Sequence, residues 1–338
     1  MNYIENAETI ETLLAEPDLA RVADALRTLV RPAIRLHASN ATDDATIPVG
    51  ASKIGGMPDL PDESEWPAGT LTIPEPSAAF REAVQRTRSD LRLPPPGNRV
   101  RLGFVAQIRL SDLRDSIADN PLPPDGTLWF FWTNQWFASD AGKAVNASDL
   151  KYNSYYGGFC DAGGFRVLYD AAGLTAARRT APGDLEPSDT GFKAYPATFA
   201  PMLMLPRVET SIIGESDETT PPGIVSLNGD EWNLYSELTH SEHIPNVDHL
   251  LGYSQNGQSY AMETSYKTFR PAFFPDLPPW DALSPEEQQR EHEGNVLLLQ
   301  IEPRDFPMHF GRGGALYFFI RRADLAQRDF GKVWAWIQ

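Results

Sequence analysis

The sequence contains a single cysteine, Cys160, among its 338 residues. One cysteine can form neither an internal disulfide nor a cysteine metal cluster, and this usage is typical of the reducing cytosol. The first twenty residues lack the basic and apolar regions of a secretory signal. Nowhere do roughly 18 uncharged apolar residues follow one another, as a membrane-spanning helix requires. We therefore expect a cytoplasmic protein without a membrane span.

Basic residues are scarce as well. Lys and Arg number 29 against 46 Asp and Glu, which gives a formal net charge of −17. Such a charge repels nucleic-acid phosphates, whose binding needs neutralisation by basic side chains. It attracts cationic molecules and speeds their association. We expect no nucleic-acid partner and consider a basic protein partner, with solubility alone as the plainer interpretation of the charge.

The sequence contains no motif that is specific to one class of reaction. No Gly-x-x-x-x-Gly-Lys-Ser/Thr phosphate-binding loop is present. The one histidine cluster, His240-x-x-His243 with His249, lies at a helix end that runs into a loop and has no cysteine beside it. Carboxylates are plentiful, but the sequence alone pairs none of them as acid and base. The sequence therefore assigns no catalytic residue, and we predict no metal and no cofactor.

What the chain does have is 29 Pro and 25 Gly, which favours short strands and irregular connections. Residues 7–30 show helical spacing, and Pro17 divides them into two predicted helices. Ser284-Pro285-Glu286-Glu287 predicts a helix start with a capping box. We expect that helix to reach Glu293 and to end at Gly294 in the left-handed conformation.

Two buried strands are predicted at 102–108 and 296–301, because each is apolar except for a single glutamine. Each is followed by a glycine-containing turn and then by an aromatic strand, 127–132 in the first case and 315–320 in the second. Three features recur in the same order at a near-constant distance. They are Gly56 and Gly252 (196 residues apart), Gln107 and Gln300 (193 apart), and Gly126 and Gly314 (188 apart).

This recurrence predicts a β-rich α+β fold built from two similar halves that are related by internal duplication. We expect one globular unit over 1–338. Within it, 1–31 forms a helical N-terminal segment, 32–170 the first β-rich repeat and 192–338 the second.

The same residues carry a resemblance to a known family. The loop Ser-Lys-Ile-Gly-Gly-x-Pro-x-Leu-Pro from Ser52, with Trp66-Pro67 after it, resembles the signature of the YwqG-like family of uncharacterised bacterial proteins. So do the strand that ends in Gln107-Ile108 and the closing Leu-Leu-Gln-Ile and Gly-x-Leu-Tyr-Phe-Phe-Ile. The resemblance runs from about Pro32 to the C-terminus. It implies an α+β fold of two related halves and supplies no activity.

The chain departs from that family in one turn. Members often place an acidic residue before the last aromatic strand, where this chain has Gly-Arg-Gly-Gly at 311–314. An acidic or metal-binding role at this turn is therefore not carried over.

Four residues are candidates for ligand binding. Lys53, beside paired glycines, could meet an anion held by backbone N–H groups, or it could pair with a carboxylate. Trp66 could be a ligand platform or a core anchor. Gln107 and Gln300 could converge on a pocket between the halves, or each could hold a backbone loop, because a buried amide needs hydrogen-bond partners.

From these observations we expect a non-catalytic cytosolic binding protein, one version of which docks a basic protein partner as acidic immunity proteins do. The alternative is a hydrolase or small-molecule-binding protein with its site between the halves, around Lys53, Gln107 and Gln300. A deep pocket lined by these residues would favour the alternative, and a filled junction would count against it. The sequence indicates no oligomeric state.

Overall fold

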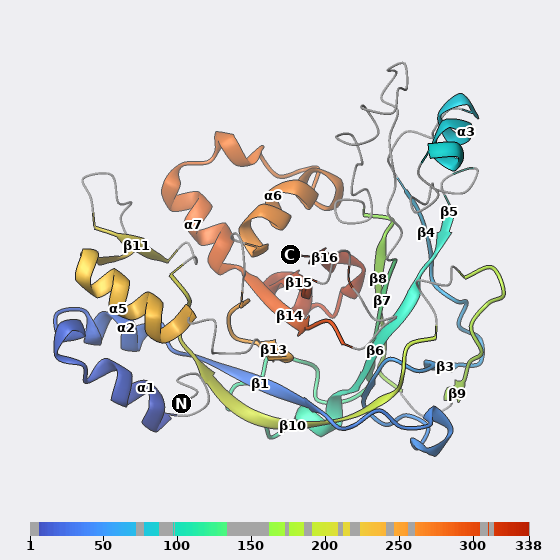
Figure 1. Ribbon diagram of the computed structural model, residues 1–338, viewed down its shortest axis with the longest axis horizontal. Coiled ribbons are helices and arrows are strands. Elements are labelled where there is room, and N and C mark those ends of the chain that lie inside the picture. Colours follow the sequence, from blue (N-terminus) through green and yellow to red (C-terminus); the bar gives the residue numbers. More distant parts are fainter. Residues whose placement is uncertain are drawn as a thin grey trace.

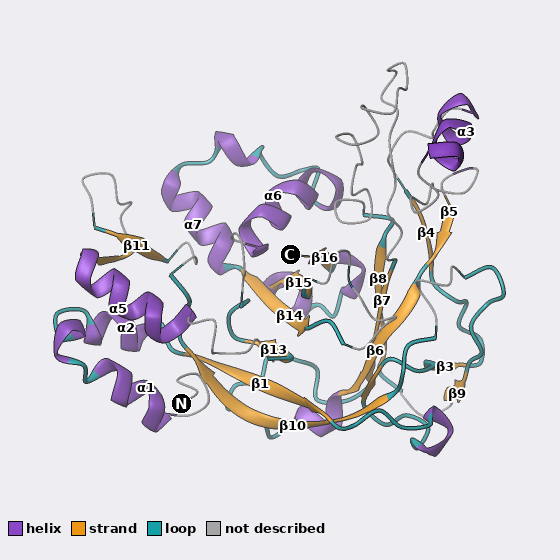
Figure 2. Cartoon of the chain, viewed as in Figure 1, coloured by secondary structure: helices purple, strands orange, loops and turns teal. Residues whose placement is uncertain are grey.

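The computed structural model describes residues 7–71, 78–87, 97, 99–133, 162–172, 176–185, 191–208, 212–216, 224–240, 247–255, 261–304, 310 and 314–337. Figures 1 and 2 show a β-rich fold in which helices lie beside one large, curved sheet. Ten strands form this sheet in the order β16-β15-β14-β13-β1-β10-β2-β6-β7-β8. Their bounds are β1 (Arg31–Ala38), β2 (Lys53–Ile54), β6 (Gly103–Arg109), β7 (Thr127–Trp132), β8 (Phe165–Asp170), β10 (Tyr195–Met204), β13 (His249–Leu251), β14 (Asn295–Ile301), β15 (Leu316–Arg321) and β16 (Trp334–Ile337).

Three two-stranded ribbons and seven α-helices complete the described part of the chain. The ribbons are β3 (Asp59–Pro61) with β9 (Ala176–Arg178), β4 (Ala68–Thr70) with β5 (Arg99–Arg101), and β11 (Ile213–Glu215) with β12 (Val225–Leu227). The helices are α1 (Ala7–Leu14), α2 (Ala23–Thr28), α3 (Ala78–Thr87), α5 (Gly229–His240), α6 (Ala261–Phe273), α7 (Pro285–Glu293) and α8 (Arg322–Ala326). None of these helices is both long and apolar enough to cross a membrane.

The centre of the sheet is an exchange of strands between the two halves. β1 and β10 pair along their lengths in antiparallel register, from Arg31 opposite Met204 to Ala38 opposite Ala197. On its other side β1 pairs with β13 of the second half, and β10 pairs with β2 of the first. The first strand of each half therefore lies beside the second strand of the other half.

Local backbone features recur around this centre. The register of β6 against β7 shifts between Phe104 and Ala106, and that of β14 against β15 shifts between Leu297 and Leu299. Such bulges bend a strand and increase its twist. The shifts stand 193 residues apart, the same distance that separates Gln107 from Gln300.

The turns after β2 and β13 also match. Gly55 and Gly56 have φ of +66° and +71°, and Leu251 and Gly252 have φ of +64° and +68°. Leu251 is strained there because its Cβ disfavours the left-handed region, whereas glycine enters that region freely.

The main core fills the concave side of the sheet, where both halves contribute side chains. Phe130 of β7 and Phe318 of β15 meet edge to face with ring centroids 5.0 Å apart. The end strands β8 and β16 come into contact, so the sheet is nearly closed. Helix α6 packs on β16, where the Trp334 indole N–H donates to Ser265 Oγ at 2.9 Å. This burial of aromatic rings is the main source of hydrophobic stabilisation in the fold.

A second core lies under the N-terminal helices. Residues of α1 and α2 pack with α5, β11 and β12. The Tyr235 hydroxyl, fully buried in this core, donates to the Pro206 carbonyl oxygen at 2.7 Å. Arg21 forms a two-pronged ion pair with Glu231 at its edge.

Strands β6 and β14 lie where the sequence predicts them, and so does α7. Ser284 and Glu287 form the predicted capping box. The predicted left-handed ending is wrong, because Gly294 has φ of −70°. Its N–H donates to the Arg290 carbonyl oxygen at 3.0 Å and its own carbonyl accepts from Arg322 N–H at 2.7 Å. The right-handed conformation holds both bonds and leads the chain directly into β14.

Candidate functional site

The glycine loop begins at β2, a two-residue strand held between β10 and β6. Gly55 and Gly56 turn the chain back beneath the 3₁₀ turn Asp44–Thr46. A Cβ at Gly56 would stand 2.7 Å from Asp44 Oδ1 and 2.9 Å from the Ala194 Cβ. Glycine is required here by both the positive φ and the close approach.

Lys53 is completely buried at the start of this loop. Its Nζ donates to Asp44 Oδ1 at 2.7 Å and lies 3.8 Å from Asp59 Oδ2. Burial lowers the pKa of the Lys53 ammonium, against the opposing effect of its hydrogen bond with Asp44 and of both negative charges. Of the two alternatives for Lys53, the structure contains the carboxylate pairing.

Asp59 opens β3 and is also completely buried. Arg178 Nε, from the neighbouring strand β9, donates to its Oδ1 at 2.9 Å, and Gly50 N–H donates to its Oδ2 at 2.9 Å. Burial alone raises the pKa of this carboxyl. The hydrogen bonds from Arg178, Gly50 and Gln107 outweigh that effect, so the pKa of Asp59 falls below its usual range.

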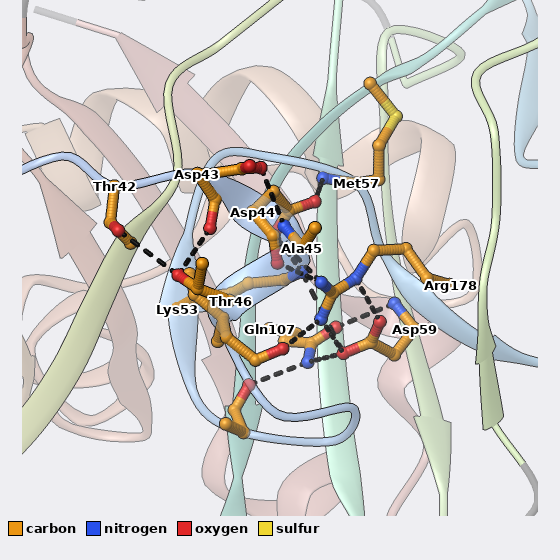
Figure 3. Close-up of polar contacts among 12 residues, drawn as sticks. Thr42, Asp43, Asp44, Ala45, Thr46, Lys53, Met57, Asp59, Gln107 and Arg178 are labelled. Atoms are coloured by element: carbon orange, nitrogen blue, oxygen red, sulfur yellow. Dashed lines mark hydrogen bonds and ion pairs between the residues drawn. The ribbon is translucent and has the colours of Figure 1, made fainter.

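Arg178 and Asp44 extend the cluster to the 3₁₀ turn. Arg178 donates through Nη2 to the Ile47 carbonyl oxygen at 2.9 Å and through Nη1 to the Asp44 carbonyl oxygen. The Asp44 carboxylate also accepts from Met57 N–H at 2.8 Å. Two cations and two carboxylates thus tie together three segments that lie far apart in the sequence (Figure 3).

Gln107 of β6 completes the cluster and is fully buried. Its Oε1 accepts from Asp59 N–H at 2.9 Å. Its Nε2 donates to the Ala51 carbonyl oxygen at 2.7 Å and to Asp59 Oδ2 at 2.8 Å. The acceptor and both donors of the amide are therefore occupied by the loop of the same half (Figure 3).

Gln300 occupies the corresponding place in β14 and is also fully buried. Its Oε1 accepts from Gln255 N–H at 2.9 Å, and its Nε2 donates to Glu302 Oε1 at 2.9 Å. Each glutamine thus bonds the loop of its own half. These contacts are those of the structural alternative, and the rings of Phe130 and Phe318, one from each half, pack together in the main core.

Trp66 is buried in a third, smaller core. Its indole N–H donates to the Leu102 carbonyl oxygen at 2.8 Å, and its ring meets Phe131 edge to face at 5.7 Å between centroids. Both contacts are with the first half's own strands, as expected of a core anchor.

The histidine cluster contributes one described imidazole. His249 is fully buried in β13, with Nδ1 2.8 Å from the Val247 carbonyl oxygen and Nε2 2.9 Å from that of Tyr253. His243 lies outside the described residues, as do Cys160 and the turn at 311–313. Within the described ranges, no group of three or more His, Cys, Asp or Glu side chains could hold a metal ion.

An open depression of about 620 Å³ lies beside the 3₁₀ turn that Lys53 and Arg178 hold. Hydroxyl groups of Thr42, Thr46 and Ser52 line it. Ser52 Oγ donates to Asp112 Oδ2 at 2.9 Å. None of the four candidate residues from the sequence lines this depression, so their chemistry is directed into the protein rather than toward this surface.

Comparison with protein families gives one match. The model of a domain of unknown function, DUF1963, matches residues 52–338. The chain belongs to the DUF1963 family. The match begins at Ser52, at the start of the glycine loop, and takes in both glutamine-bonded loops. No curated protein matches the chain.

Proposed function

We propose that this DUF1963 protein is a non-catalytic binding protein that docks a basic protein partner. The proposal rests on the Lys53 cluster, which consists of Asp44, Lys53, Asp59, Gln107 and Arg178. The polar side chains of this cluster already have hydrogen-bond or ion-pair partners within the chain. Lys53, Asp59 and Gln107 have no exposed surface, and their polar atoms bind one another and nearby backbone groups. A general acid or base must reach a substrate proton, and these groups meet only the chain itself.

The charge distribution supports a basic partner. Lys53 and Arg178 balance Asp44 and Asp59 inside the cluster, so the net charge of −17 arises elsewhere in the chain. The loop after β3 provides an example, with Asp62, Glu63 and Glu65 all exposed. Clustered like charges on a surface steer an oppositely charged protein and accelerate its association.

Retention of partners by the immobilised chain at low and at raised salt tests this proposal. A partner should be retained in stoichiometric amount at low salt and released as salt rises, because screening weakens exposed charge pairs. Hen lysozyme serves as a basic comparator, since retention equal to that of lysozyme would indicate charge attraction alone. If no protein is retained in stoichiometric amount, the proposal fails.

We also propose that the two halves arose by internal duplication, as in the YwqG-like proteins that the chain resembles. The exchanged strands, the paired bulges and the two glutamine-bonded loops all support this origin. Hydrogen bonds across the centre also correspond. Ala197 N–H donates to the Ser52 carbonyl oxygen at 3.0 Å, and Leu36 N–H donates to that of Asp248 at 2.8 Å. A cytosolic location stays part of this proposal, based on the single cysteine.

A small-molecule-binding role is the second candidate, favoured by the depression beside the 3₁₀ turn. Arg109 Nε donates to Asp112 Oδ1 at 2.8 Å on its rim, which fixes the direction of the guanidinium. Replacing Arg109 with Gln should abolish binding of any ligand held there. The Lys53 cluster should remain intact in that variant, because Arg109 makes no contact with it.

A further inference from the structure

A second pocket, of about 550 Å³, lies between the C-terminal part of α6 and the segment that follows it. It is remote from the Lys53 cluster in sequence and shares none of the residues of that cluster. Its walls are largely apolar, which suits a hydrophobic ligand body. The apolar residues that line it are Pro271, Phe274, Pro275, Leu277, Pro279 and Trp280.

Arg270 gives this pocket an unusual polar group. The residue is only 3% exposed, and its Nε has no hydrogen-bond partner. The carboxylate paired with it, Glu291, places Oε2 4.0 Å from Nη2, which is beyond hydrogen-bond distance. A buried charge is costly unless it is both paired and hydrogen-bonded. The Arg270 Nε–H therefore lacks an acceptor of the kind that a bound anion would supply.

Lys267 brings a second positive charge to the pocket wall, one turn before Arg270 on α6. Its Nζ pairs with Glu263 Oε1 at 2.7 Å and lies 5.2 Å from the centroid of the Trp280 ring. Asp281 is the acidic residue in the lining. Two cations at one pocket are notable in a chain whose net charge is −17, because an anion would be repelled from most of its surface.

The aromatic walls are fixed in place. Trp280 packs edge to face on Tyr266, with ring centroids 5.8 Å apart. The centroid of the Phe274 ring lies 4.8 Å from the Arg321 guanidinium and 5.8 Å from the Lys332 ammonium. A preformed wall loses little conformational freedom when a ligand binds, so more of the contact energy appears as affinity.

From this combination we propose that the pocket binds an organic carboxylate with a flat, apolar body. The ring of the ligand lies against Trp280 and the prolines. Its carboxylate accepts hydrogen bonds from Arg270 and meets the charge of Lys267, since charge-assisted bonds from arginine to a carboxylate are strong and directional. This site is independent of the proposed docking of a basic protein.

Calorimetric titration of the full chain tests the site with three probes: indole-3-acetate, its neutral analogue indole-3-ethanol, and acetate. We expect one molecule of indole-3-acetate to bind per chain, and each of the other two probes to bind at least about tenfold more weakly. Arg270→Gln should weaken indole-3-acetate binding by about tenfold and Lys267→Gln by about threefold. Arg290→Gln, an exposed arginine on α7 outside the pocket, is the matched control and should leave affinity unchanged.

A thermal unfolding measurement separates a binding role from a structural one. Arg270→Met should leave the melting temperature close to that of the wild type, because Arg270 Nε has no hydrogen-bond partner and the carboxylate left behind, Glu291, is partly exposed to water. The proposal is overturned if indole-3-ethanol binds as tightly as indole-3-acetate, or if no probe binds. It is also overturned if Arg270→Met unfolds the protein while Lys267→Gln leaves affinity unchanged.

Discussion

In each half of the sheet, a loop is hydrogen-bonded to a buried glutamine at the same strand position, but the side chains around the two glutamines differ. In the first half Gln107 accepts from the backbone N–H of Asp59, and in the second Gln300 accepts from that of Gln255. Asp59 and Gln255 stand 196 positions apart in the sequence, as Lys53 and His249 do. The backbone bond is therefore common to both halves, whereas a buried lysine between two carboxylates belongs to the first half. In the second half Gln300 bonds the Glu302 carboxylate, and Asp248 pairs with Arg304.

The difference shows which part of the arrangement the fold needs. Lys53 and His249 both lie opposite the glutamine of the next strand and are fully buried. Lys53 meets carboxylates, while the His249 ring meets two backbone carbonyl oxygens. Burial lowers the pKa of His249, which favours the neutral ring. Each half thus has a buried polar side chain at this position, which is satisfied by an ion pair in the first half and by backbone carbonyl oxygens in the second.

The largest difference in the free energy of unfolding is expected when the side chain after each turn, Asp59 in the first loop and Gln255 in the second, is replaced. Asp59→Leu leaves the buried Lys53 and the partly buried Arg178 without their shared carboxylate, so we expect a loss of about 3–5 kcal/mol in the free energy of unfolding. Gln255→Leu removes the acceptor of Val247 N–H, and we expect a loss of about 1–3 kcal/mol. Urea unfolding of both variants measures the difference. Equal losses would mean that the charges add nothing to the first loop.

Replacing the glutamines is expected to have the next largest effect. Gln107→Leu removes three hydrogen bonds and should cost about 3 kcal/mol, because Asp59 N–H and the Ala51 carbonyl are left buried. Gln300→Leu removes two hydrogen bonds and should lower the free energy of unfolding by about 2 kcal/mol. The same unfolding measurement applies. A larger loss at Gln300 would reverse the order of the two loops.

Alanine at the second glycine of each turn should cost less. Gly56→Ala and Gly252→Ala both force alanine into positive φ. In both loops the new Cβ meets an alanine Cβ, that of Ala194 at 2.9 Å or that of Ala33 at 2.8 Å. The loops differ in the second neighbour, which is Asp44 Oδ1 at 2.7 Å in the first and Met204 Sδ at 2.7 Å in the second. Asp44 is held by Lys53, whereas a methionine side chain adapts, so we expect losses of about 2 and 1 kcal/mol respectively. Equal losses would show that Asp44 yields as readily as Met204.

The smallest expected difference between the loops is in how the free energy of unfolding depends on pH. The pKa of Asp59 is lower in the folded protein than in the unfolded chain, so acid protonates the unfolded chain first. The stability that Asp59 contributes is present above the unfolded pKa of about 4 and is lost as pH falls through the lower folded pKa. Urea unfolding across this pH range should show a shallower slope for Asp59→Asn. Gln255→Leu, which removes no carboxyl group, should keep the wild-type slope.

The sequence predicts the parts of this fold that depend on short-range pattern. The strands around Gln107 and Gln300 are continuous apolar runs, which makes both the strands and the burial of the glutamines predictable. The pairing of Lys53 with a carboxylate is also among the sequence alternatives. The carboxylates themselves, Asp44 and Asp59, are ordinary loop aspartates in the sequence and carry no signal of their own.

Other features depend on contacts that sequence spacing does not encode. Arg178 lies 119 positions from Asp59, and only the pairing of β3 with β9 brings the two together. Helix α6 is not predicted from the sequence. Pro271 stands in its last turn, where it has no N–H to donate to the carbonyl oxygen four residues earlier.

The exchanged strands have a consequence for how the protein is made. β2 needs β10 as its neighbour, and Tyr195, the first residue of β10, leaves the ribosome long after Ile54. Reciprocally, β13 of the second half must find β1, which is synthesised near the start. Neither half of the sheet can be completed during synthesis of its own residues. Assembly therefore awaits most of the chain, and the nascent first half presents unpaired strand edges to chaperones until then.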